Sequence, residues 1–300
     1  MKLWIPDAAG REAVGELPQN VELGLIPADG SFPDAMLGAE FLVPRGRGVG
    51  EILPQMSSLR VIQTLSAGVD WLAPMVPAGV TLCDAAGTRD IAVAEWVLAG
   101  ILSCIRTFPE LRDAQRRHDW AWRQSDELAG RTVMILGYGE IGRAVEARLA
   151  PFGVELIRVA RHGHDGVHAV QELGSLLPLA DVVVVLLPLT AETTGLLDAD
   201  ALALLRPGAL LVNAARGAVV DSRALLALLQ AGRIRAALDV TDPEPLPEGD
   251  PFWDAPGTLI TPHYAGATPQ GERRAFALVG EQVRRYMRGQ PLANIVEHGY

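Results

Sequence analysis

Short apolar runs separated by turn residues follow one another through the first ninety residues of the chain. Five of these runs predict β-strands, and stretches such as 49–56 predict short helices between them. The expected strands lie at 2–6, 21–27, 40–44, 59–65 and 79–84. This alternation of strand and helix favours a small parallel sheet.

Residues 88–118 carry the longest helical pattern in the chain. We expect a single helical run here, linking two domains. Its apolar residues from Ile91 to Ile105 are too dense around the helix for one face to pack against one sheet. The segment therefore predicts a surface on which two copies of the chain associate.

A second series of strands and helices begins after Arg131. Its strand-like runs are continuously apolar, as expected when helices cover both faces of a sheet. The expected strands lie at 132–137, 155–160, 181–187, 209–214, 236–240 and 258–263, and the expected helices at 140–152, 170–180, 193–205 and 221–232. We expect the amphipathic segment 268–294 to return to the first domain.

Length and charge narrow the range of functions. A chain of 300 residues is longer than one core usually serves, which favours two domains. The formal net charge of −10 argues against nucleic-acid binding, because that needs a basic face. The net charge does not exclude a small anionic substrate, since the attraction of one buried arginine outweighs the repulsion of a distant acidic surface.

The cellular setting is expected to be the cytoplasm. The two cysteines, Cys83 and Cys104, are too few for a disulfide framework and are expected as buried small hydrophobic residues. The N-terminal segment lacks the pattern of a signal peptide. The most apolar segment, 179–189, is too short to span a membrane and contains Asp181 and Pro188, so we expect no membrane contact.

A glycine-rich turn at 137–142 follows the strand-like run 132–137 and precedes a helical pattern. Gly137 permits the tight turn, Gly139 lets the backbone approach a pyrophosphate, and Gly142 lets helix and strand pack closely. The N–H groups at the start of the helix then face the phosphate charge. The pattern is weak alone, but five further strand signals favour a dinucleotide site.

Seven motifs carry the resemblance of this chain to a known family. They are SAGVD (66–70), VAEWVLAGIL (93–102), LGYGEIGRAV (136–145), LLPLTAETTGLL (186–197), VNAARGAVVD (212–221), AALDVTDPEP (236–245) and TPHYAG (261–266). In this order they resemble the D-isomer-specific 2-hydroxyacid dehydrogenases, and the glyoxylate/hydroxypyruvate reductases in particular.

This resemblance implies an α/β fold of two Rossmann-like domains with parallel sheets. A flavodoxin-like substrate domain would comprise residues 1–90 and 268–300, and a dinucleotide-binding domain residues 91–267. The resemblance also implies a cleft between the domains, hydride transfer with a nicotinamide cofactor, and a homodimer joined through the nucleotide domain.

Reduction of a 2-keto acid needs groups that hold the carboxylate, polarise the carbonyl and protonate the developing alkoxide. Arg216 follows a strand, at the edge where α/β sheets bind ligands, and its guanidinium suits a carboxylate. His263 also follows a strand, and an imidazole can both give and take a proton. We expect Glu244 to hydrogen-bond to His263 and favour the imidazolium. The resemblance places the catalytic roles on the same three residues.

The resemblance also implies which residues contact substrate and cofactor. The substrate carboxylate would be held by Arg216 and by backbone N–H groups in the SAGVD loop, namely those of Ala67, Gly68 and Val69. Asp239 would bond the nicotinamide carboxamide. The full set expected at the cofactor is Gly137, Tyr138, Gly139, Glu140, Ile141, Gly142, Ala160, Arg161, His162, Leu187, Pro188, Thr193, Ala214, Ala215 and Asp239.

The end of the strand 155–160 predicts which nicotinamide cofactor is used. NAD-dependent enzymes usually place an acidic residue about 20 residues beyond the glycines, to bind the ribose 2′-OH. Here that position is Ala160, followed by Arg161 and His162, which suit the 2′-phosphate of NADP. We expect NADPH to be preferred. Asp165 keeps NAD open if its loop folds back.

The remaining histidines predict no metal site. His162, His164 and His168 form a loose cluster without a further ligand or a defined spacing, so we expect a solvated loop. Substrate specificity is expected from the loop 43–48, Trp71 and Tyr264. Within that loop, Arg45 or Arg47 is a candidate for a second anionic group, although flexible surface arginines are the plainer reading.

Two alternatives stay open at the level of function. One is a nucleotide-binding regulator, since the family resembled here also contains transcriptional corepressors of similar fold. The other is a dehydrogenase of the same fold acting on another small acid, such as formate or phosphite. The chain lacks the long N-terminal extension typical of the formate enzymes. The preferred expectation is reduction of a small or medium 2-keto acid to the D-2-hydroxy acid.

Overall fold

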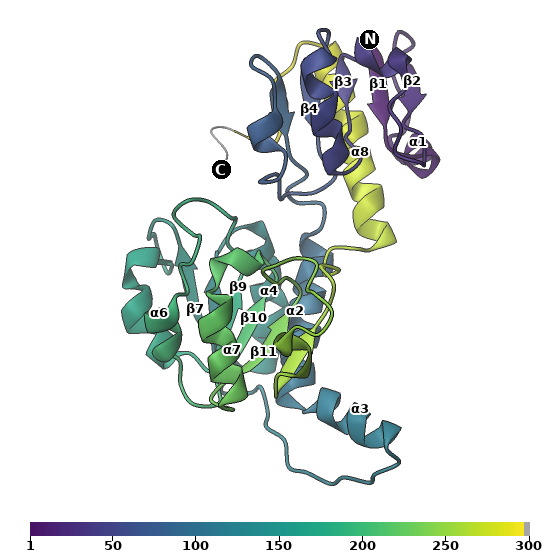
Figure 1. Cartoon of the computed structure of the whole chain (residues 1–300). Coiled ribbons are helices and arrows are strands. Elements are labelled where there is room, and N and C mark those ends of the chain that lie inside the picture. The colour runs from purple at the N-terminus through teal and green to yellow at the C-terminus, as the bar shows by residue number, and fades with distance from the viewer. Residues whose placement is uncertain (297–300) are drawn as a thin grey trace. The chain divides into compact units, whose positions relative to one another are not determined.

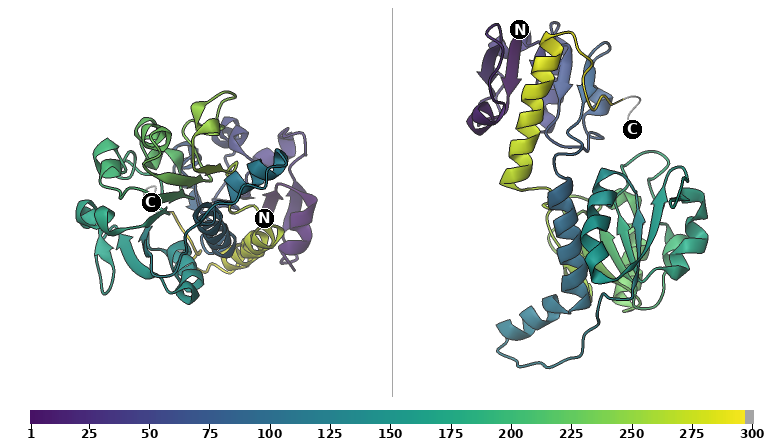
Figure 2. Two further views of the ribbon diagram at one scale, coloured as in Figure 1. Left: turned by 90° about the horizontal axis from the view of Figure 1, so that it is seen from below. Right: turned by 180° about the vertical axis from the view of Figure 1, so that it is seen from behind.

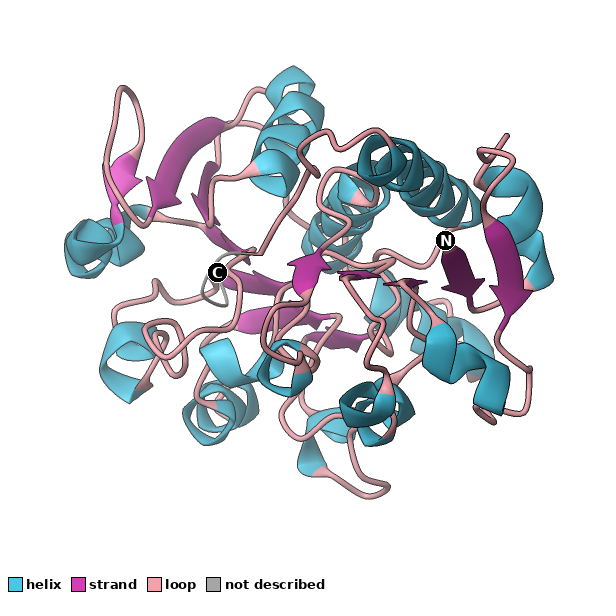
Figure 3. Ribbon diagram, turned by 90° about the horizontal axis from the view of Figure 1, so that it is seen from above, coloured by secondary structure: helices cyan, strands magenta, loops and turns pink. Residues whose placement is uncertain are grey.

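The computed structural model describes residues 1–296, apart from the side chain of Arg47. The chain forms two compact units, each described here by itself. Unit 1 is Met1–Arg89 together with the segment from Ala267 onward, and unit 2 is Asp90–Gly266. In both units helices flank the strands, as Figure 3 shows.

Unit 1 is built on a five-stranded parallel sheet in the order β2-β1-β3-β4-β5. Its strands are short, and the central strands β3 and β4 are wholly buried; the five are β1 (Lys2–Ile5), β2 (Glu22–Leu25), β3 (Phe41–Leu42), β4 (Val61–Gln63) and β5 (Thr81–Cys83). This order is the flavodoxin-like one. The expected flavodoxin-like α/β fold is therefore confirmed for this unit.

Two apolar layers cover the sheet of unit 1. On one face, α8 (Pro269–Met287) contributes Phe276, Val279 and Val283 to a cluster with Leu3 and Phe41. The helix α1 (Ala8–Ala13) lies beside α8, and Gly10 allows that closeness because a Cβ there would meet the Phe276 ring. The other face packs under short 3₁₀ helices, two of which, Arg47–Glu51 and Leu53–Gln55, cover most of the short helix expected at 49–56.

Unit 2 is built on a seven-stranded sheet in the order β12-β11-β10-β9-β6-β7-β8, with all pairs parallel. The strands are β6 (Thr132–Leu136), β7 (Glu155–Ala160), β8 (His168–Ala169), β9 (Val182–Val185), β10 (Leu210–Asn213), β11 (Arg235–Leu238) and β12 (Thr258–Ile260). The chain order reverses between β6 and β9, which is the switch point of a Rossmann fold. Only the edge strand β8 was not expected from the sequence.

Helices cover both faces of this sheet. On one face α2 (Asp90–Ile105) and α4 (Glu140–Leu149) enclose a core with β6, β9 and β10. On the other face lie α5 (Leu173–Leu176), α6 (Ala199–Ala203) and α7 (Ser222–Gln230). Figure 2 shows α2 running along the sheet. The close approach depends on Gly100, because a Cβ there would lie 3.3 Å from the Cβ of Ala237.

The expected single helix at 88–118 is wrong. The structure has two helices, α2 and α3 (Phe108–Arg116), bent by 66°. The break falls at Thr107, whose φ of 54° is left-handed, and Pro109 follows in the first turn of α3. Proline has no N–H to donate to the preceding turn, so it begins a helix more readily than it continues one.

Much of the apolar segment Ile91–Ile105, expected as a surface of association, is covered within unit 2 itself. Nine residues of α2, including Trp96, Val97 and Ile101, are already buried in unit 2 by the sheet and α4. Large exposed apolar side chains follow instead in and after α3: Phe108, Trp120 and Trp122, of which the tryptophans are 97% and 84% exposed. This segment, 108–125, extends away from the sheet of unit 2 (Figure 1).

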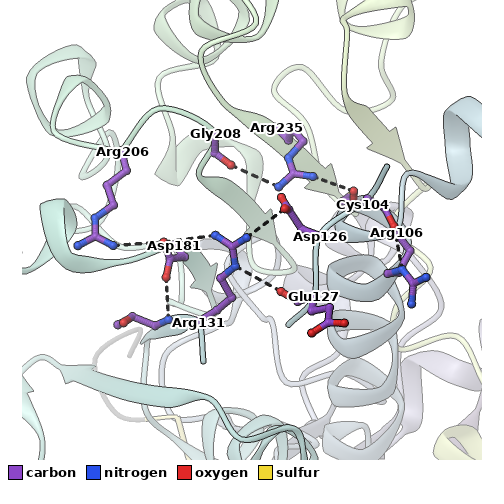
Figure 4. A network of polar contacts seen from close by, with 11 residues as sticks. Cys104, Arg106, Asp126, Glu127, Arg131, Asp181, Arg206, Gly208 and Arg235 are labelled. Carbon is purple, nitrogen blue, oxygen red and sulfur yellow. Dashed lines mark hydrogen bonds and ion pairs between the residues drawn. The ribbon is translucent and has the colours of Figure 1, made fainter. Parts of the chain in front are cut away.

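Ion pairs join the segments at the amino edge of the unit 2 sheet (Figure 4). Asp181 accepts from the backbone N–H of Thr132 at 2.9 Å and pairs with Arg206 at 3.2 Å. Arg131 lies 3.3 Å from Asp126, at the return of the segment that follows α3. Polar side chains at this edge therefore serve the fold.

Within residues 1–296, no individual helix is both long and apolar enough for a membrane span, and the bent pair of α2 and α3 passes that test together by length and composition alone.

Candidate active site

The predicted site residues of unit 2 gather at the carboxyl edge of its sheet. The glycine turn follows β6, Arg161 follows β7, and Pro188 follows β9 after a short stretch. Arg216, Glu244 and His263 follow β10, β11 and β12, which are neighbours in the sheet. Figure 1 labels β7, β9, β10 and β11 of this sheet. The edge thus has a half with the dinucleotide motifs and a half with the acid–base and cationic groups.

The glycine turn has the geometry that a pyrophosphate requires. Gly137 has a φ of 108°, and a Cβ there would lie 2.7 Å from the carbonyl carbon of Leu186. At Gly142 a Cβ would meet the carbonyl oxygen of Gly137 at 2.9 Å, whereas at Gly139 it would meet nothing within 4 Å. The α4 helix begins at Glu140 with no side chain capping its first N–H groups. An anion can therefore approach Gly139 and the start of α4.

Tyr138, between the first two glycines, is held by a cluster that we call the Tyr138 clamp: Tyr138, Glu146 and Arg158. The hydroxyl of Tyr138 donates to Glu146 at 2.5 Å, and Arg158 donates two hydrogen bonds to the same carboxylate at 2.6 and 2.8 Å. The guanidinium carbon lies 5.8 Å from the centre of the Tyr138 ring. The clamp ties the glycine turn to α4 and β7. Glu146 and Arg158 were not predicted from the sequence, because neither belongs to a motif.

The Arg158 hydrogen bonds hold the pKa of Glu146 below its usual range, and the Tyr138 hydroxyl adds to the effect. The same carboxylate raises the pKa of Tyr138, chiefly because the tyrosine hydroxyl donates to it. Both shifts favour the arrangement found, in which a neutral tyrosine donates to a charged glutamate.

The end of β7 bears the residues expected at the 2′-position of the cofactor. Ala160 ends the strand, and Arg161 and His162 are exposed. The Arg161 guanidinium pairs with Glu192 at 2.7 Å. Glu192 lies in the PLTAET loop, and its role toward Arg161 was not anticipated. Asp165 is exposed in a turn closed by backbone hydrogen bonds between His164 and Val167.

The histidine cluster expected as a solvated loop is exposed at all three positions, and His168 hydrogen-bonds to Glu172 at 2.9 Å. Across residues 1–296, no group of three or more histidine, cysteine, aspartate or glutamate side chains could hold a metal ion.

The PLTAET loop, 188–193, is internally cross-linked by threonine hydroxyls. Thr193 donates its hydroxyl to the carbonyl of Pro188 at 2.6 Å and accepts from the N–H of Thr190 at 2.8 Å. Thr190 accepts in turn from the N–H of Glu192 at 3.2 Å. Leu187 is buried in the core, so only its backbone can face a ligand. These hydrogen bonds therefore define the backbone of the loop.

Arg216 is positioned by Asn213, a residue that the sequence analysis did not select. The buried Asn213 side chain accepts from the N–H of Ala215 and donates to the carbonyl of Arg216, each at 3.0 Å. Gly217 completes the turn, because a Cβ there would lie 2.1 Å from the backbone of Thr241. Ala214 is partly exposed, while Ala215 is buried in the core. The turn leaves the Arg216 side chain partly exposed at the edge of the sheet.

His263 and Glu244 form the pair that the sequence predicts. Nδ1 of His263 lies 2.7 Å from Oε1 of Glu244, and the two side chains are 46% and 40% exposed. This contact directs Nε2, the other ring nitrogen, away from the glutamate. His263 has a φ of 52°, an unusual conformation for a residue other than glycine. Such strain is held by surrounding contacts and is common at functional sites.

Asp239 supplies the contacts that hold His263. Its side chain is buried and accepts three hydrogen bonds: from the Thr261 hydroxyl at 2.5 Å, Tyr264 N–H at 2.8 Å and Ala265 N–H at 2.9 Å. Its carbonyl accepts from the N–H of His263 at 2.7 Å. The sequence analysis gave Asp239 a role toward the cofactor alone. The structure gives it four contacts with the 261–265 turn, which contains His263.

In unit 1 the SAGVD loop follows β4 at the carboxyl edge of that sheet. The Ser66 carbonyl accepts from the Thr64 hydroxyl at 2.6 Å, and its hydroxyl donates to the Gly68 carbonyl at 3.2 Å. Ala67 and Gly68 are partly exposed, and the Val69 side chain is buried. Their role toward a substrate carboxylate stays a prediction.

The candidate specificity residues lie in both units. In unit 1, Arg45 donates to the Pro6 carbonyl at 3.0 Å, Trp71 packs beside the apolar cluster, and the Arg47 side chain lies outside the described part of the chain. In unit 2, Tyr264 is 54% exposed directly after His263.

Comparison with known proteins identifies the family. Residues 98–265 match the family model described as D-isomer specific 2-hydroxyacid dehydrogenase, NAD binding domain. A D-3-phosphoglycerate dehydrogenase from Mycobacterium bovis is 33% identical over 98% of this chain, and the chain spans 58% of the length of that relative.

Two solved structures resemble this one over nearly their whole length. One is a D-isomer specific 2-hydroxyacid dehydrogenase from Xanthobacter autotrophicus Py2 in complex with NADPH and MES; it is 31% identical, with a TM-score of 0.85, and covers 100% of this chain and 99% of that one. The other is an NADPH-dependent glyoxylate/hydroxypyruvate reductase from Sinorhizobium meliloti in complex with NADP and sulfate; it is 27% identical, with a TM-score of 0.87 and the same two coverages. The chain belongs to the D-isomer specific 2-hydroxyacid dehydrogenase family.

Proposed function

We propose that this protein reduces a small or medium 2-keto acid to the D-2-hydroxy acid, with NADPH as the preferred cofactor. The observation that carries the proposal is the Glu244–His263 pair at 2.7 Å on the same sheet edge as Arg216. A general acid beside an anion-binding group is what this reduction requires. Glyoxylate and hydroxypyruvate are the substrates we favour, in line with the Sinorhizobium reductase.

In this proposal each residue acts through a stated atom. Arg216 binds the substrate carboxylate and polarises the keto oxygen through its guanidinium. His263 gives its proton to the developing alkoxide from Nε2, while Glu244 accepts a hydrogen bond from Nδ1–H and fixes the orientation of the ring. The bound nicotinamide supplies the hydride. Asn213 and Asp239 position Arg216 and His263 through the hydrogen bonds of their turns.

The cofactor proposal rests on the fit of the glycine turn and the end of β7. The open space at Gly139 and the uncapped start of α4 suit a pyrophosphate. Ala160 offers no acid to the ribose hydroxyl, and Arg161 offers a guanidinium to a 2′-phosphate. The solved Xanthobacter and Sinorhizobium relatives were obtained with NADPH and NADP.

A panel of 2-keto acids assayed with NADPH and NADH tests this function. The panel contains glyoxylate, hydroxypyruvate, 3-phosphohydroxypyruvate, pyruvate and a branched 2-keto acid, and chiral chromatography identifies the product. We expect the highest kcat/KM with glyoxylate or hydroxypyruvate, a D-product from hydroxypyruvate, and NADPH ahead of NADH. Absence of turnover with every acid and both cofactors would contradict the enzyme assignment, and a clear preference for NADH would contradict the cofactor assignment.

We also propose that the protein is a homodimer in which segment 108–125 of unit 2 contacts the second copy. This segment carries Trp120 and Trp122, whose near-complete exposure on one chain is costly in water. A partner that covers them removes that cost, and a second copy of the chain supplies the same apolar segment in return.

A further inference from the structure

Arg161, the proposed 2′-phosphate ligand, is paired with an acid of this same chain. Its guanidinium lies 2.7 Å from Oε1 of Glu192, and the two side chains are 60% and 63% exposed. We propose that Glu192 lowers the affinity for 2′-phosphorylated dinucleotides. It thereby sets the ratio of the affinities of this enzyme for NADPH and NADH. The inference rests on the cofactor proposed above and adds a residue that determines specificity.

The backbone on each side of this ion pair is fixed. Arg161 directly follows β7, whose end accepts hydrogen bonds from the glycine turn: the N–H groups of Gly137 and Tyr138 donate to the Val159 carbonyl at 2.9 and 3.0 Å. Glu192 lies in the PLTAET loop, where its own N–H donates to the Thr190 hydroxyl. The two charges therefore meet beside the dinucleotide motifs through defined elements.

Charge determines the sign of the effect. A phosphate monoester carries about −1.5 to −2 charges at pH 7. If it binds Arg161, it must either displace the Glu192 carboxylate or share the guanidinium with it. Displacement loses an ion pair, and sharing places two anions close together. NADH has a neutral hydroxyl at this position, so neither cost applies to it.

The size of the effect follows from the exposure of the pair. Exposed ion pairs contribute little to stability, and water screens the repulsion of exposed anions. Removing the Glu192 charge should therefore tighten binding of a 2′-phosphate by about three- to tenfold at low salt, and by less at high salt.

The test compares ligands that differ only at the 2′-position. Binding of NADPH and NADH is followed by nucleotide fluorescence, and binding of 2′,5′-ADP and 5′-AMP by calorimetry, for the unmodified protein and for Glu192→Gln. We expect the Kd for NADPH and for 2′,5′-ADP to fall about three- to tenfold, with NADH and 5′-AMP changed less than twofold. The difference should shrink between about 25 and 500 mM salt.

Two matched variants separate this effect from general charge effects. Glu155→Gln removes an exposed acid at the start of β7. At about 3.3 Å per residue this acid lies on the order of 20 Å from Arg161, so the Kd values of NADPH and NADH should both stay unchanged. Glu140→Gln removes an acid from the first turn of α4, beside the pyrophosphate common to both cofactors. It should change NADPH and NADH alike.

The outcomes separate this inference from the proposed function. Suppose that Arg161→Ala weakens NADPH binding, but Glu192→Gln does not raise the affinity for NADPH relative to that for NADH. Glu192 then does not oppose binding of the phosphate, and the inference is wrong. If Arg161→Ala leaves NADPH binding unchanged, both the inference and the proposed 2′-phosphate site are wrong. Turnover of the keto-acid panel is a separate measurement and decides the enzyme assignment alone.

Discussion

His263 combines a left-handed backbone with a side chain that meets Glu244 through Nδ1, so its remaining nitrogen is committed to one direction. Replacement of His263 by alanine should lower kcat by about 10²-fold or more, the usual contribution of a positioned acid–base group. NADPH binding, followed by nucleotide fluorescence, should stay within about twofold. Near-normal turnover in His263→Ala would remove this residue from the mechanism.

The prediction for Arg216 differs, because we propose that it both binds the substrate carboxylate and polarises the carbonyl. Arg216→Ala should raise KM for the keto acid and lower kcat, whereas Arg216→Lys should restore part of the binding and little of kcat. A lysine keeps the charge but lacks the planar pair of N–H donors that meets a carboxylate and its neighbouring oxygen. Steady-state kinetics of the two variants decide this. Full recovery of kcat in the lysine variant would contradict the polarising role.

Asp239→Asn tests a positioning role. An amide cannot accept at both ends, so at least one of the three donors from Thr261, Tyr264 and Ala265 loses its acceptor. This should cost about 1–3 kcal/mol of unfolding free energy, the usual penalty of an unpaired buried group. If Asp239 positions His263, kcat and its pH profile change at saturating NADPH. If it serves the cofactor alone, only the KM for the cofactor rises.

At the scale of single residues, the sequence was enough to predict the contact between Glu244 and His263, because each residue stands in a short, recognisable motif that follows a strand. It was not enough for Glu192, Asn213 or Glu146. The roles of these three depend on which loops and strands meet in space, and Glu192 meets Arg161 across 31 positions of the chain. A sequence pattern gives the type of residue at each position, but it does not show which distant residues are in contact.

Among the elements, the Tyr138 clamp links the glycine turn to α4 and β7, and it gives a pH-dependent prediction. The lowered pKa of Glu146 means that its ion pair stabilises the fold above the ordinary glutamate value of 4.5, and that this stabilisation is lost as pH falls through the lower folded-state pKa. Glu146→Gln should therefore cost about 1–2 kcal/mol at pH 7 and progressively less below pH 4.5.

Urea unfolding of the unmodified protein and of Glu146→Gln, at pH 7 and at pH 3.5–4, measures this difference. The exposed pair of Glu281 and Arg285 on α8 serves as the control, since Glu281→Gln should cost less than about 1 kcal/mol at either pH. An equal cost of Glu146→Gln at both pH values would show that its charge is not what stabilises the clamp.

Helix boundaries were predictable where a residue with a clear preference marks them. Asp221 begins α7 and accepts from the N–H of Ala224 at 2.9 Å, as a capping aspartate does. The break between α2 and α3 was missed although Pro109 signals it, because the apolar pattern before it was given more weight. The short helix expected at 49–56 is divided into two 3₁₀ segments, and a pattern of eight residues is too short to indicate the type of helix.

For the whole molecule, the α/β fold class was predictable from the sequence. The continuously apolar strands after Arg131 indicate a sheet that is covered by helices on both faces. The strand orders came from the resemblance to a family, because strands of similar composition can be arranged in many ways. The sequence also could not show how much of the apolar segment Ile91–Ile105 is available to a second copy of the chain. The density of apolar residues in α2 does not reveal that α4 and the sheet cover them within one chain.

Assembly is therefore tested at the segment after α3. The double substitution Trp120→Ser with Trp122→Ser should shift the protein from dimer to monomer at micromolar concentration, because it removes the two most exposed aromatic side chains of the segment. Light scattering after size exclusion gives the mass. Trp253→Ser, at a half-exposed tryptophan elsewhere in unit 2, should leave the dimer intact. An unmodified protein that is monomeric at this concentration would contradict the proposed assembly.

The split of unit 1 across the chain has a consequence for how the protein is made. Leu3 and Phe41 leave the ribosome early, but the α8 residues that cover them, Phe276 and Val279, come only after all of unit 2 has been synthesised. At roughly 5–20 residues per second this interval is on the order of ten seconds or more. Unit 2, which is continuous in sequence, can complete its core during that time. Until then, one apolar face of the unit 1 sheet stays exposed on the nascent chain. We expect chaperones to bind this face of the nascent chain.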